Sequence, residues 1–271
     1  MTLAASASVI ELGAFELTLA AVLVLVTGLV SVALRLGLEK RLAVAAVRTV
    51  VQLLLIGYIL RYVFAMHSPW LLGVVVAVML AVAAHAAVAR TQVRVPGILS
   101  LSLLALAGSS LITTWIVTRL IIGVEPWYLP QYVIPLLGMI LGNSLTGVSL
   151  ALDQVLTALR DRRDEVEMEL ALGATRWEAA RRPLREAVRR GMIPTINAMS
   201  VVGIVSLPGM MTGQILAGVD PMLAVEYQIV VMFMIAAATA LGCIFAALLV
   251  YRRLFNAKHQ LMAERIERRG G

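Results

Sequence analysis

Charged residues are scarce in this sequence. Of its 271 residues, only 14% are charged, whereas 61% are hydrophobic. Soluble globular domains average about 25% charged and about 45–50% apolar residues. The deficit of charge excludes an ordinary soluble domain and places the chain among integral membrane proteins.

Cysteine and lysine are also rare, and each shortage excludes a class of site. Cys243 is the single cysteine, so no disulfide can form within one chain. A P-loop requires a lysine directly after a glycine, but neither of the two lysines, Lys40 and Lys258, follows one. No H-E-x-x-H metalloprotease motif occurs, and the three histidines are far apart. We therefore expect a chain that is not an enzyme, with no catalytic residues and no bound cofactor. Its metal ligands, if it has any, remain unknown at this point.

Long apolar runs dominate the chain. A helix needs about 20 apolar residues to cross a bilayer core, and seven segments qualify: residues 15–34, 42–60, 70–89, 96–118, 129–152, 192–219 and 224–250. They are too long for membrane strands and lack period-two alternation. The sequence therefore predicts an all-α polytopic membrane protein with about seven transmembrane helices, built as a single permease domain over residues 1–271.

Basic residues mark alternate connections between these spans. Apart from Arg48, Arg61 and Arg119, the 23 Lys and Arg residues lie in the first, third and fifth connections and after the last span. Cytoplasmic loops are enriched in Lys and Arg, so this pattern predicts an N-terminus outside and a cytoplasmic C-terminus. The first charges, Glu11 and Glu16, are acidic, so we expect no cleaved signal peptide. Because the arginines are spread over separate loops, we expect no nucleic-acid binding.

The fifth connection, residues 153–191, is the one long polar stretch, with nine basic and eight acidic residues. Residues 153–169 are expected to continue the fifth span as a helix, and residues 171–175 to interrupt it. Gly173 can end a helix in the left-handed conformation. Thr175 can cap a second helix from 176 to about 188, with Glu178 at capping-box spacing. Pro183 is expected to kink or split that second helix.

This predicted hairpin has more than one interpretation. It is either a solvated hairpin without a partner or the surface through which a separate ATPase moves the spans, because a chain without a P-loop must receive its energy from another subunit. A membrane sensor or scaffold that binds a regulator here is the rival outside transport. In the ATPase interpretation, the expected coupling residues are Glu165, Glu169, Gly173, Ala174, Thr175 and Arg176.

A few polar residues lie within the predicted spans. Arg48 and Gln52 share one face of the second span, and a charge in the bilayer costs at least a few kcal/mol. The pair is therefore expected either to contact a neighbouring helix or to line a transport pathway. Gly138 and Gly142 have the small-xxx-small spacing that favours close helix packing, and Asn143 follows them.

The sixth predicted span is interrupted by Pro194 and Pro208. Broken backbone at membrane depth is tolerated where it is buried in protein or lines a cavity, which favours a pathway-facing segment. Four methionines, Met139, Met199, Met210 and Met211, can offer thioether sulfur to a soft metal, although methionine more often serves in packing. The expected pathway residues are Arg48, Gln52, Met139, Asn143, Pro208, Met210 and Met211.

Several stretches resemble one family of permeases. They are residues 48–53 with 57–58, residues 133–143, residues 172–175 and, most specifically, the run from Ile193-Pro194-Thr195 to Tyr227-Gln228-Ile229. Over nearly its whole length the sequence is similar to the FetB/YbbM permeases, the membrane half of a bacterial iron-export ABC transporter.

The resemblance implies a multi-pass permease of the bacterial inner membrane that exports iron and contributes to metal homeostasis and oxidative-stress resistance. Its implied partner is a FetA/YbbL-like ATPase that binds Mg-ATP. We expect two permeases to pair with two ATPases, because one chain supplies one docking loop. Plant relatives are associated with aluminium tolerance and nucleotide-sugar transport, so another metal or an organic molecule is the alternative cargo. Residues 183–186 depart from the Ile-x-Leu-Pro of importer loops, so we do not expect an importer.

Overall fold

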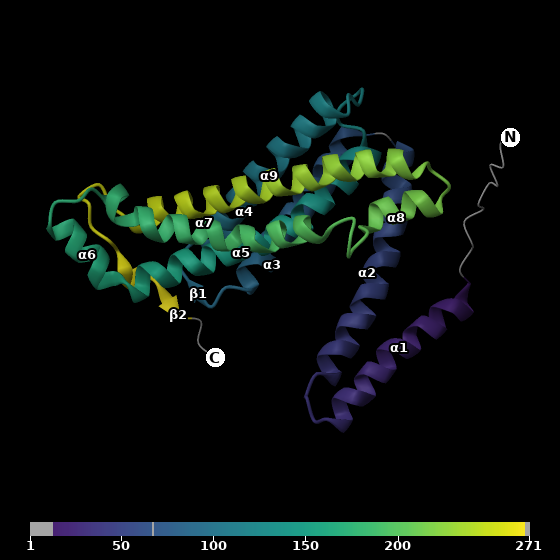
Figure 1. Ribbon diagram of the computed structural model, residues 1–271, viewed down its shortest axis with the longest axis horizontal. Coiled ribbons are helices and arrows are strands. Elements are labelled where there is room, and N and C mark those ends of the chain that lie inside the picture. The colour runs from purple at the N-terminus through teal and green to yellow at the C-terminus, as the bar shows by residue number, and fades with distance from the viewer. Residues whose placement is uncertain (1–12, 67, 269–271) are drawn as a thin grey trace. The chain divides into compact units, whose positions relative to one another are not determined.

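The computed structural model describes residues 13–66 and 68–268. Over these residues the chain is mostly helical, in the order that Figure 1 shows. The two strands of the described part, β1 (Val93–Arg94) and β2 (Glu267–Arg268), form one short antiparallel pair. The predicted all-α membrane class is confirmed.

Six of the described helical segments have the length and apolar composition to cross a membrane. They are α1 (Ala14–Ala33), α2 (Glu39–Met66), α3 (Pro69–Ala89), α4 (Ile98–Trp115) with its π-helical extension η1 (Ile116–Ile121), α5 (Pro130–Asp161) and α9 (Pro221–Leu254).

At residues 192–219, where an interrupted sixth span was predicted, the structure confirms a break before Pro208 but not at Pro194, which lies inside a helix. That segment is divided among the end of α7 (Arg176–Val201), an irregular stretch at 202–208 and α8 (Gly209–Leu216). Gly203 adopts a left-handed φ of 83°, and Pro208 has no N–H to donate to a preceding turn. Both residues therefore prevent one continuous helix.

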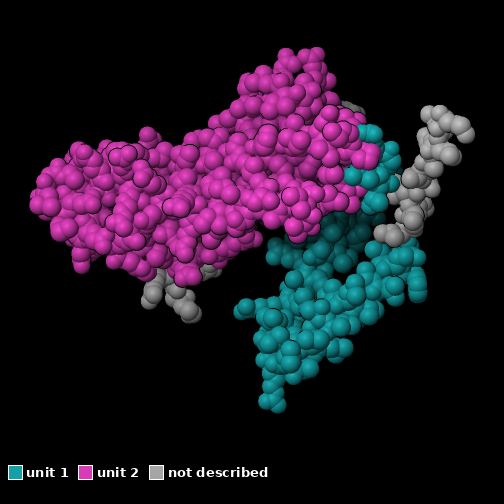
Figure 2. Space-filling model, viewed as in Figure 1, with its two compact units in different colours: residues 1–68, 213–220 teal, residues 69–212, 221–271 magenta. Residues whose placement is uncertain are grey.

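Two compact units make up the chain, and Figure 2 colours them separately. Unit 1 comprises residues 1–68 and 213–220, and unit 2 comprises residues 69–212 and 221–271. In unit 1, the Ser31 hydroxyl closes the turn between α1 and α2, because it donates to Glu39 Oε2 and accepts from the Leu38 N–H, each at 3.1 Å. Unit 2 contains most of the buried residues.

Helices α5, α7 and α9 form the centre of unit 2 and lie side by side in Figure 1. Helices α5 and α7 approach closely at Gly147 and Gly191, a contact here called the glycine seam. A Cβ atom on Gly191 would lie 2.5 Å from Cys243 Sγ of α9 and 2.7 Å from the Gly147 carbonyl oxygen. Beside the seam, the buried hydroxyls of Ser144 and Thr239 join α5 to α9 at 3.2 Å.

The predicted close-packing pair, Gly138 and Gly142, is wrong. A Cβ atom on Gly142 would meet nothing within 4 Å, and one on Gly138 would make only an ordinary contact with Met79 at 3.5 Å. The close approach occurs at Gly147 instead. Small-residue spacing identifies a helix that can pack closely, but it does not specify which face meets the neighbour.

The charged segment forms a hairpin of α6 (Arg163–Ala171) and the first half of α7. Helix α5 ends at Asp161 instead of continuing to 169, and the change of direction at Arg162 lets Val166 of α6 enter the core. At the tip, Gly173 has a φ of 96°, and the Ala174 N–H donates to the Glu169 carbonyl at 3.0 Å. The predicted left-handed helix end is therefore confirmed.

Thr175 caps α7 as predicted. The Glu178 N–H donates to the Thr175 hydroxyl at 3.3 Å, and the Thr175 N–H donates to Glu178 Oε2 at 2.7 Å. Pro183 does not split this helix, because α7 continues through it to Val201, so that half of the expectation is wrong. The alternative, a kink at Pro183, stays a prediction. Pro183 and Leu184 are buried in unit 2, and this burial offsets the loss of the backbone hydrogen bond that a proline cannot donate.

The C-terminal segment 255–268 folds back against this hairpin. Leu261 and Ile266 are buried in the same core as Val166. The Arg176 backbone N–H donates to His259 Nδ1 at 2.9 Å, and Arg176 Nη1 donates to the Asn256 carbonyl at 3.2 Å. The start of α7 is thus attached to the segment that follows α9.

Candidate functional site

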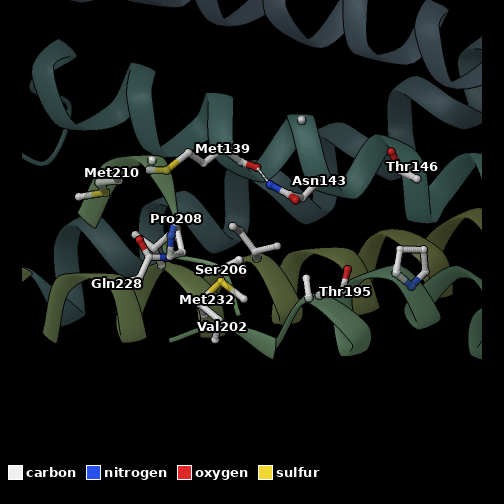
Figure 3. A pocket seen from close by; sticks show the side chains of 16 residues that line it. Met139, Asn143, Thr146, Thr195, Val202, Ser206, Pro208, Met210, Gln228 and Met232 are labelled. Carbon is white, nitrogen blue, oxygen red and sulfur yellow. Dashed lines mark hydrogen bonds between the residues drawn. The ribbon is translucent and has the colours of Figure 1, made fainter. Parts of the chain in front are cut away.

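A cavity of about 560 Å³ lies where α5, α7 and α9 separate beyond the glycine seam. The irregular stretch 202–208 forms one wall (Figure 3). Within this stretch the chain reverses at Gly203, whose N–H donates to the Ser206 carbonyl at 2.9 Å. The labelled lining residues are Met139, Asn143, Thr146, Thr195, Val202, Ser206, Pro208, Met210, Gln228 and Met232.

Among the polar side chains that line the cavity, Gln228 of α9 is the most buried, with an exposed fraction of 6%. Its Oε1 accepts no hydrogen bond from any described residue. An unpaired buried acceptor costs about 1–3 kcal/mol, so this oxygen is available to a cargo or to water. On α5, Asn143 Nδ2 donates to the Met139 carbonyl at 2.8 Å (Figure 3), which leaves the amide oxygen of Asn143 as a second acceptor.

The cavity lining is neutral. No Asp, Glu, His, Lys or Arg is among the lining residues. A cation does contact one lining residue from outside the lining, since Arg90 Nη1 donates to Thr146 Oγ1 at 3.0 Å. Within residues 13–66 and 68–268, no group of three or more His, Cys, Asp or Glu side chains could hold a metal ion.

Thioether sulfur is the other donor in the cavity. Met139 from α5, Met210 from α8 and Met232 from α9 line it together (Figure 3). Met199 and Met211 line a neighbouring cavity of about 420 Å³, which shares Gln228 and Met232 with the first. The site therefore offers amide oxygens, hydroxyls and soft sulfur, which suit weak and transient binding.

Comparison with known proteins identifies the family. UPF0014, described as an uncharacterised protein family, matches residues 14–255. The chain belongs to the UPF0014 family. Its apolar helices and its bacterial relatives make it a multi-pass protein of the inner membrane, as predicted.

Curated relatives of this UPF0014 member match over most of both chains. A UPF0014 membrane protein of Synechocystis is 42% identical and covers 84% of this chain and 88% of its own length. The probable iron export permease protein FetB of Escherichia coli is 34% identical, with 94% and 96% covered. Protein ALUMINUM SENSITIVE 3 of Arabidopsis thaliana is 32% identical, with 89% and 87% covered. No solved structure matches the chain. The resemblance expected from sequence motifs is confirmed.

The structure of the UPF0014 member brings together part of the predicted pathway. Met139, Asn143, Pro208 and Met210 line one cavity, and Met211 lines its neighbour. The other two predicted pathway residues, Arg48 and Gln52, lie on α2 in unit 1 and are not among the lining residues. Their role in a pathway stays a prediction.

Sequence reasoning missed Gln228, Met232 and Thr195 as lining residues. Gln228 carried a usable signal, because it is the one amide side chain in α9. An isolated amide in an apolar span is expensive to bury and marks a helix interface or a cavity. Met232 and Thr195 carried no comparable signal, since both residue types are common in packed helices.

The hairpin tip exposes part of the predicted coupling set. Glu165, Glu169 and Gly173 are exposed and Ala174 is half-buried, whereas Arg176 contacts the C-terminal segment. The Thr175 N–H and hydroxyl both donate to Glu178, and these bonds lower the pKa of the Glu178 carboxyl. The role of all six residues in coupling stays a prediction.

Sequence reasoning also missed Leu172 at this tip. Its side chain is 81% exposed, and Met168, one turn earlier on the same face, is exposed as well. Both lie on the charged hairpin and not in an apolar span. This pair forms an apolar patch beside the exposed carboxylates of Glu165 and Glu169.

Proposed function

We propose that this chain is the membrane-spanning permease subunit of an ATP-driven exporter, that a separate ATPase energises it, and that its cargo is iron. Two permeases would pair with two ATPases, each ATPase docked on one hairpin. One observation carries the proposal: a single continuous helix, α7, begins at the capped hairpin tip and ends at the cavity.

Helix α7 can act as a lever, meaning a rigid element that transmits movement from the hairpin tip to the cavity wall. It spans 26 residues, or about 39 Å, without interruption. Its first turn is held by the Thr175 cap, its middle by the glycine seam, and its last turns supply Thr195 and Ala198 to the cavity wall. A push on the hairpin would therefore move the cavity wall, because a packed helix transmits displacement as one body.

The hairpin tip provides a surface for an ATPase. Short helices that dock in a groove use apolar anchors at helical spacing, and Met168 and Leu172 are four residues apart and exposed. The carboxylates of Glu165 and Glu169 lie beside these anchors and would select a basic groove rim. A hairpin without a partner would not need an 81% exposed leucine at its tip.

The predicted topology fits the path of the chain. Trp177, near the start of α7, packs edge-to-face on Tyr251 near the end of α9, with ring centroids 5.5 Å apart. The chain must then travel through α7, residues 202–208 and α8 to reach Pro221, the first residue of α9. This path acts as a seventh, broken crossing, in agreement with an N-terminus outside and a cytoplasmic C-terminus.

Iron as the cargo is supported by the relatives and by the chemistry of the cavity. The Escherichia coli relative is named a probable iron export permease. Amide oxygen and thioether sulfur can bind a borderline divalent metal, although weakly without a charged ligand. Weak binding suits an exporter, because the cargo must leave the site after each cycle.

A second candidate is export of an uncharged organic solute. The neutral lining of the cavity favours it, because no charged side chain is present to pair with a metal ion. Metal content of cells with and without the gene separates the two candidates. Deletion should raise cellular iron more than other metals, and an unchanged iron content would refute iron as the cargo.

Leu172→Asp tests the ATPase coupling. The side chain is exposed, so the variant should fold normally, but it should lose co-purification with the ATPase and substrate-stimulated ATP hydrolysis. Leu172→Met keeps the apolar anchor and is the matched control. Replacing Gly173 with valine should also disrupt coupling, because its left-handed φ disfavours a side chain. Unchanged coupling in both Leu172→Asp and Gly173→Val would refute the docking assignment. The rival interpretation, a membrane sensor or scaffold, would then be favoured.

A further inference from the structure

Three arginines of α7, Arg181, Arg185 and Arg189, follow one another at four-residue intervals. Residues four apart share a helix face, so the row extends about 12 Å along the helix. All three side chains are exposed. Neighbouring arginines find partners, since Arg163 pairs with Glu167 and Arg182 with Glu186. The three in the row form no ion pair or hydrogen bond with any residue in the described part of the chain.

This row borders an apolar groove of about 420 Å³ between α7 and α9. The opposite wall consists of Ile244, Ala247 and Leu248 of α9. These residues belong to the apolar part of a predicted span, and Arg252 follows about 6–12 Å beyond them along the helix. The groove therefore begins near the membrane surface and continues beside the hydrocarbon.

An aromatic residue lies at the end of the groove that is near the start of α7. Trp177 lines it and contacts Tyr251, as described above. Trp and Tyr are enriched where the headgroup region meets the hydrocarbon. The groove therefore has an aromatic end, a row of arginines and an apolar wall, which match the interfacial region, the charged headgroup and the acyl chains of a phospholipid.

We infer that this groove binds an anionic phospholipid of the cytoplasmic leaflet. The lipid phosphate would accept from the guanidinium groups of Arg181, Arg185 and Arg189, and an acyl chain would cover Ile244 and Leu248. A cation beside an apolar span requires an anionic partner or water, and no acidic side chain lines the groove. Basic pockets between transmembrane helices on the cytoplasmic side bind anionic headgroups in this way.

Other occupants fit less well. A soluble phosphate would satisfy the arginines but would leave the wall of Ile244, Ala247 and Leu248 uncovered. A segment of the ATPase would have to enter the bilayer beside α9 to fill the groove. The lipid site is independent of the cargo and of the ATPase, so it does not rest on the proposed function.

The test uses the purified full chain in a non-ionic detergent, with phosphatidylglycerol and phosphatidylcholine titrated separately. Native mass spectrometry and the shift in melting temperature report binding. The native chain should prefer phosphatidylglycerol. A triple variant, Arg181→Gln, Arg185→Gln and Arg189→Gln, should bind it at least about tenfold more weakly, and replacement of the same three residues by lysine should retain most of the preference.

The matched control, Arg160→Gln, Arg163→Gln and Arg182→Gln, removes the same charge from the end of α5 and from the hairpin, and it should keep the lipid preference. Equal loss in both triple variants, or no loss in the first, would overturn the site. Full competition by inorganic phosphate or glycerol phosphate would identify a free-anion site and would also overturn it. If the first triple variant aggregates, Leu248→Trp decides, because it fills the apolar wall and should weaken phosphatidylglycerol binding while the arginines remain.

Discussion

At the glycine seam, α5 and α7 approach so closely that neither Gly147 nor Gly191 leaves room for a Cβ atom. Further along the same helices, a Cβ atom on Gly142 would meet nothing within 4 Å, and a cavity of about 560 Å³ opens. Two regions built from the same helices thus differ in packing. Tight packing joins α7 to α5 at the seam, whereas the end of α7 borders a cavity.

We expect the two regions to have different roles. A close-packed seam resists change and can act as a pivot, whereas a broken backbone around a neutral cavity can admit and release a cargo. If substitutions at the seam and at the cavity had the same effects on stability and transport, this difference in role would be refuted.

The largest expected effect is on the seam. Gly191→Val places atoms against Cys243 Sγ and the Gly147 carbonyl, one of which is backbone and cannot turn away. We expect a loss of about 3 kcal/mol or more in the free energy of unfolding, measured by denaturation in mixed micelles. Gly142→Val is the control at the open region and should change it by no more than about 0.5 kcal/mol. Similar losses in both variants would contradict the difference in packing.

The next effect concerns the cavity. Gln228→Leu removes an unpaired buried acceptor, so stability should rise by about 1 kcal/mol. Export by the reconstituted complex should fall by about tenfold, or about 1.4 kcal/mol of binding free energy, because one oxygen atom that can bind the cargo is lost. Gln214→Leu is a matched control, since its Oε1 is also unpaired but does not line the cavity. If Gln228→Leu exports normally, Gln228 is not part of the pathway.

A smaller effect is expected at the start of the lever. Thr175→Ala removes the cap of α7 and should destabilise its first turn by about 1 kcal/mol. Fluorescence of Trp177, in a chain whose other tryptophans are replaced by phenylalanine, reports that turn during denaturant titration. A local midpoint equal to that of the unsubstituted chain would show that the cap contributes nothing there.

The cap should also depend on pH. Hydrogen bonds from Thr175 lower the folded-state pKa of Glu178 from its ordinary value of 4.5. A lowered carboxyl pKa contributes stability that is present above the unfolded pKa and is lost as pH falls through the folded pKa. Trp177 fluorescence should therefore remain constant near neutral pH and change only below about pH 4.5. Glu178→Gln should abolish that step, and its persistence would assign it to another group.

Much of the hairpin could be predicted from the sequence. Gly173 and Thr175 act through local backbone rules, so their roles follow from neighbouring residues alone. The effect of Pro183 could not be predicted in the same way, because burial of α7 in unit 2 overrides the local penalty. The long apolar spans could be predicted too, because their length and composition can be read from consecutive residues, as the cap can.

The cavity was only partly predictable. Pro208 and the methionines marked an unusual segment, but the partners of that segment come from α5 and α9, far away in the sequence. Gly142 and Gly147 lie on different faces of α5, and small-residue spacing does not reveal which face meets a neighbour. Gln228 became significant once its oxygen was seen to lack a partner among the described residues.

The central claim is that α7 pivots at the glycine seam and moves the cavity wall when the ATPase binds ATP. Spin labels in a Cys243→Ala background test it directly, with one pair at positions 196 and 229, next to the lining residues Thr195 and Gln228, and a control pair at 190 and 244, next to Gly191 and Cys243. In the complex with its ATPase, trapping with Mg-ATP and vanadate should change the first distance by on the order of 5 Å and the second by less than about 1 Å. Equal changes in both pairs, or none in either, would contradict the lever.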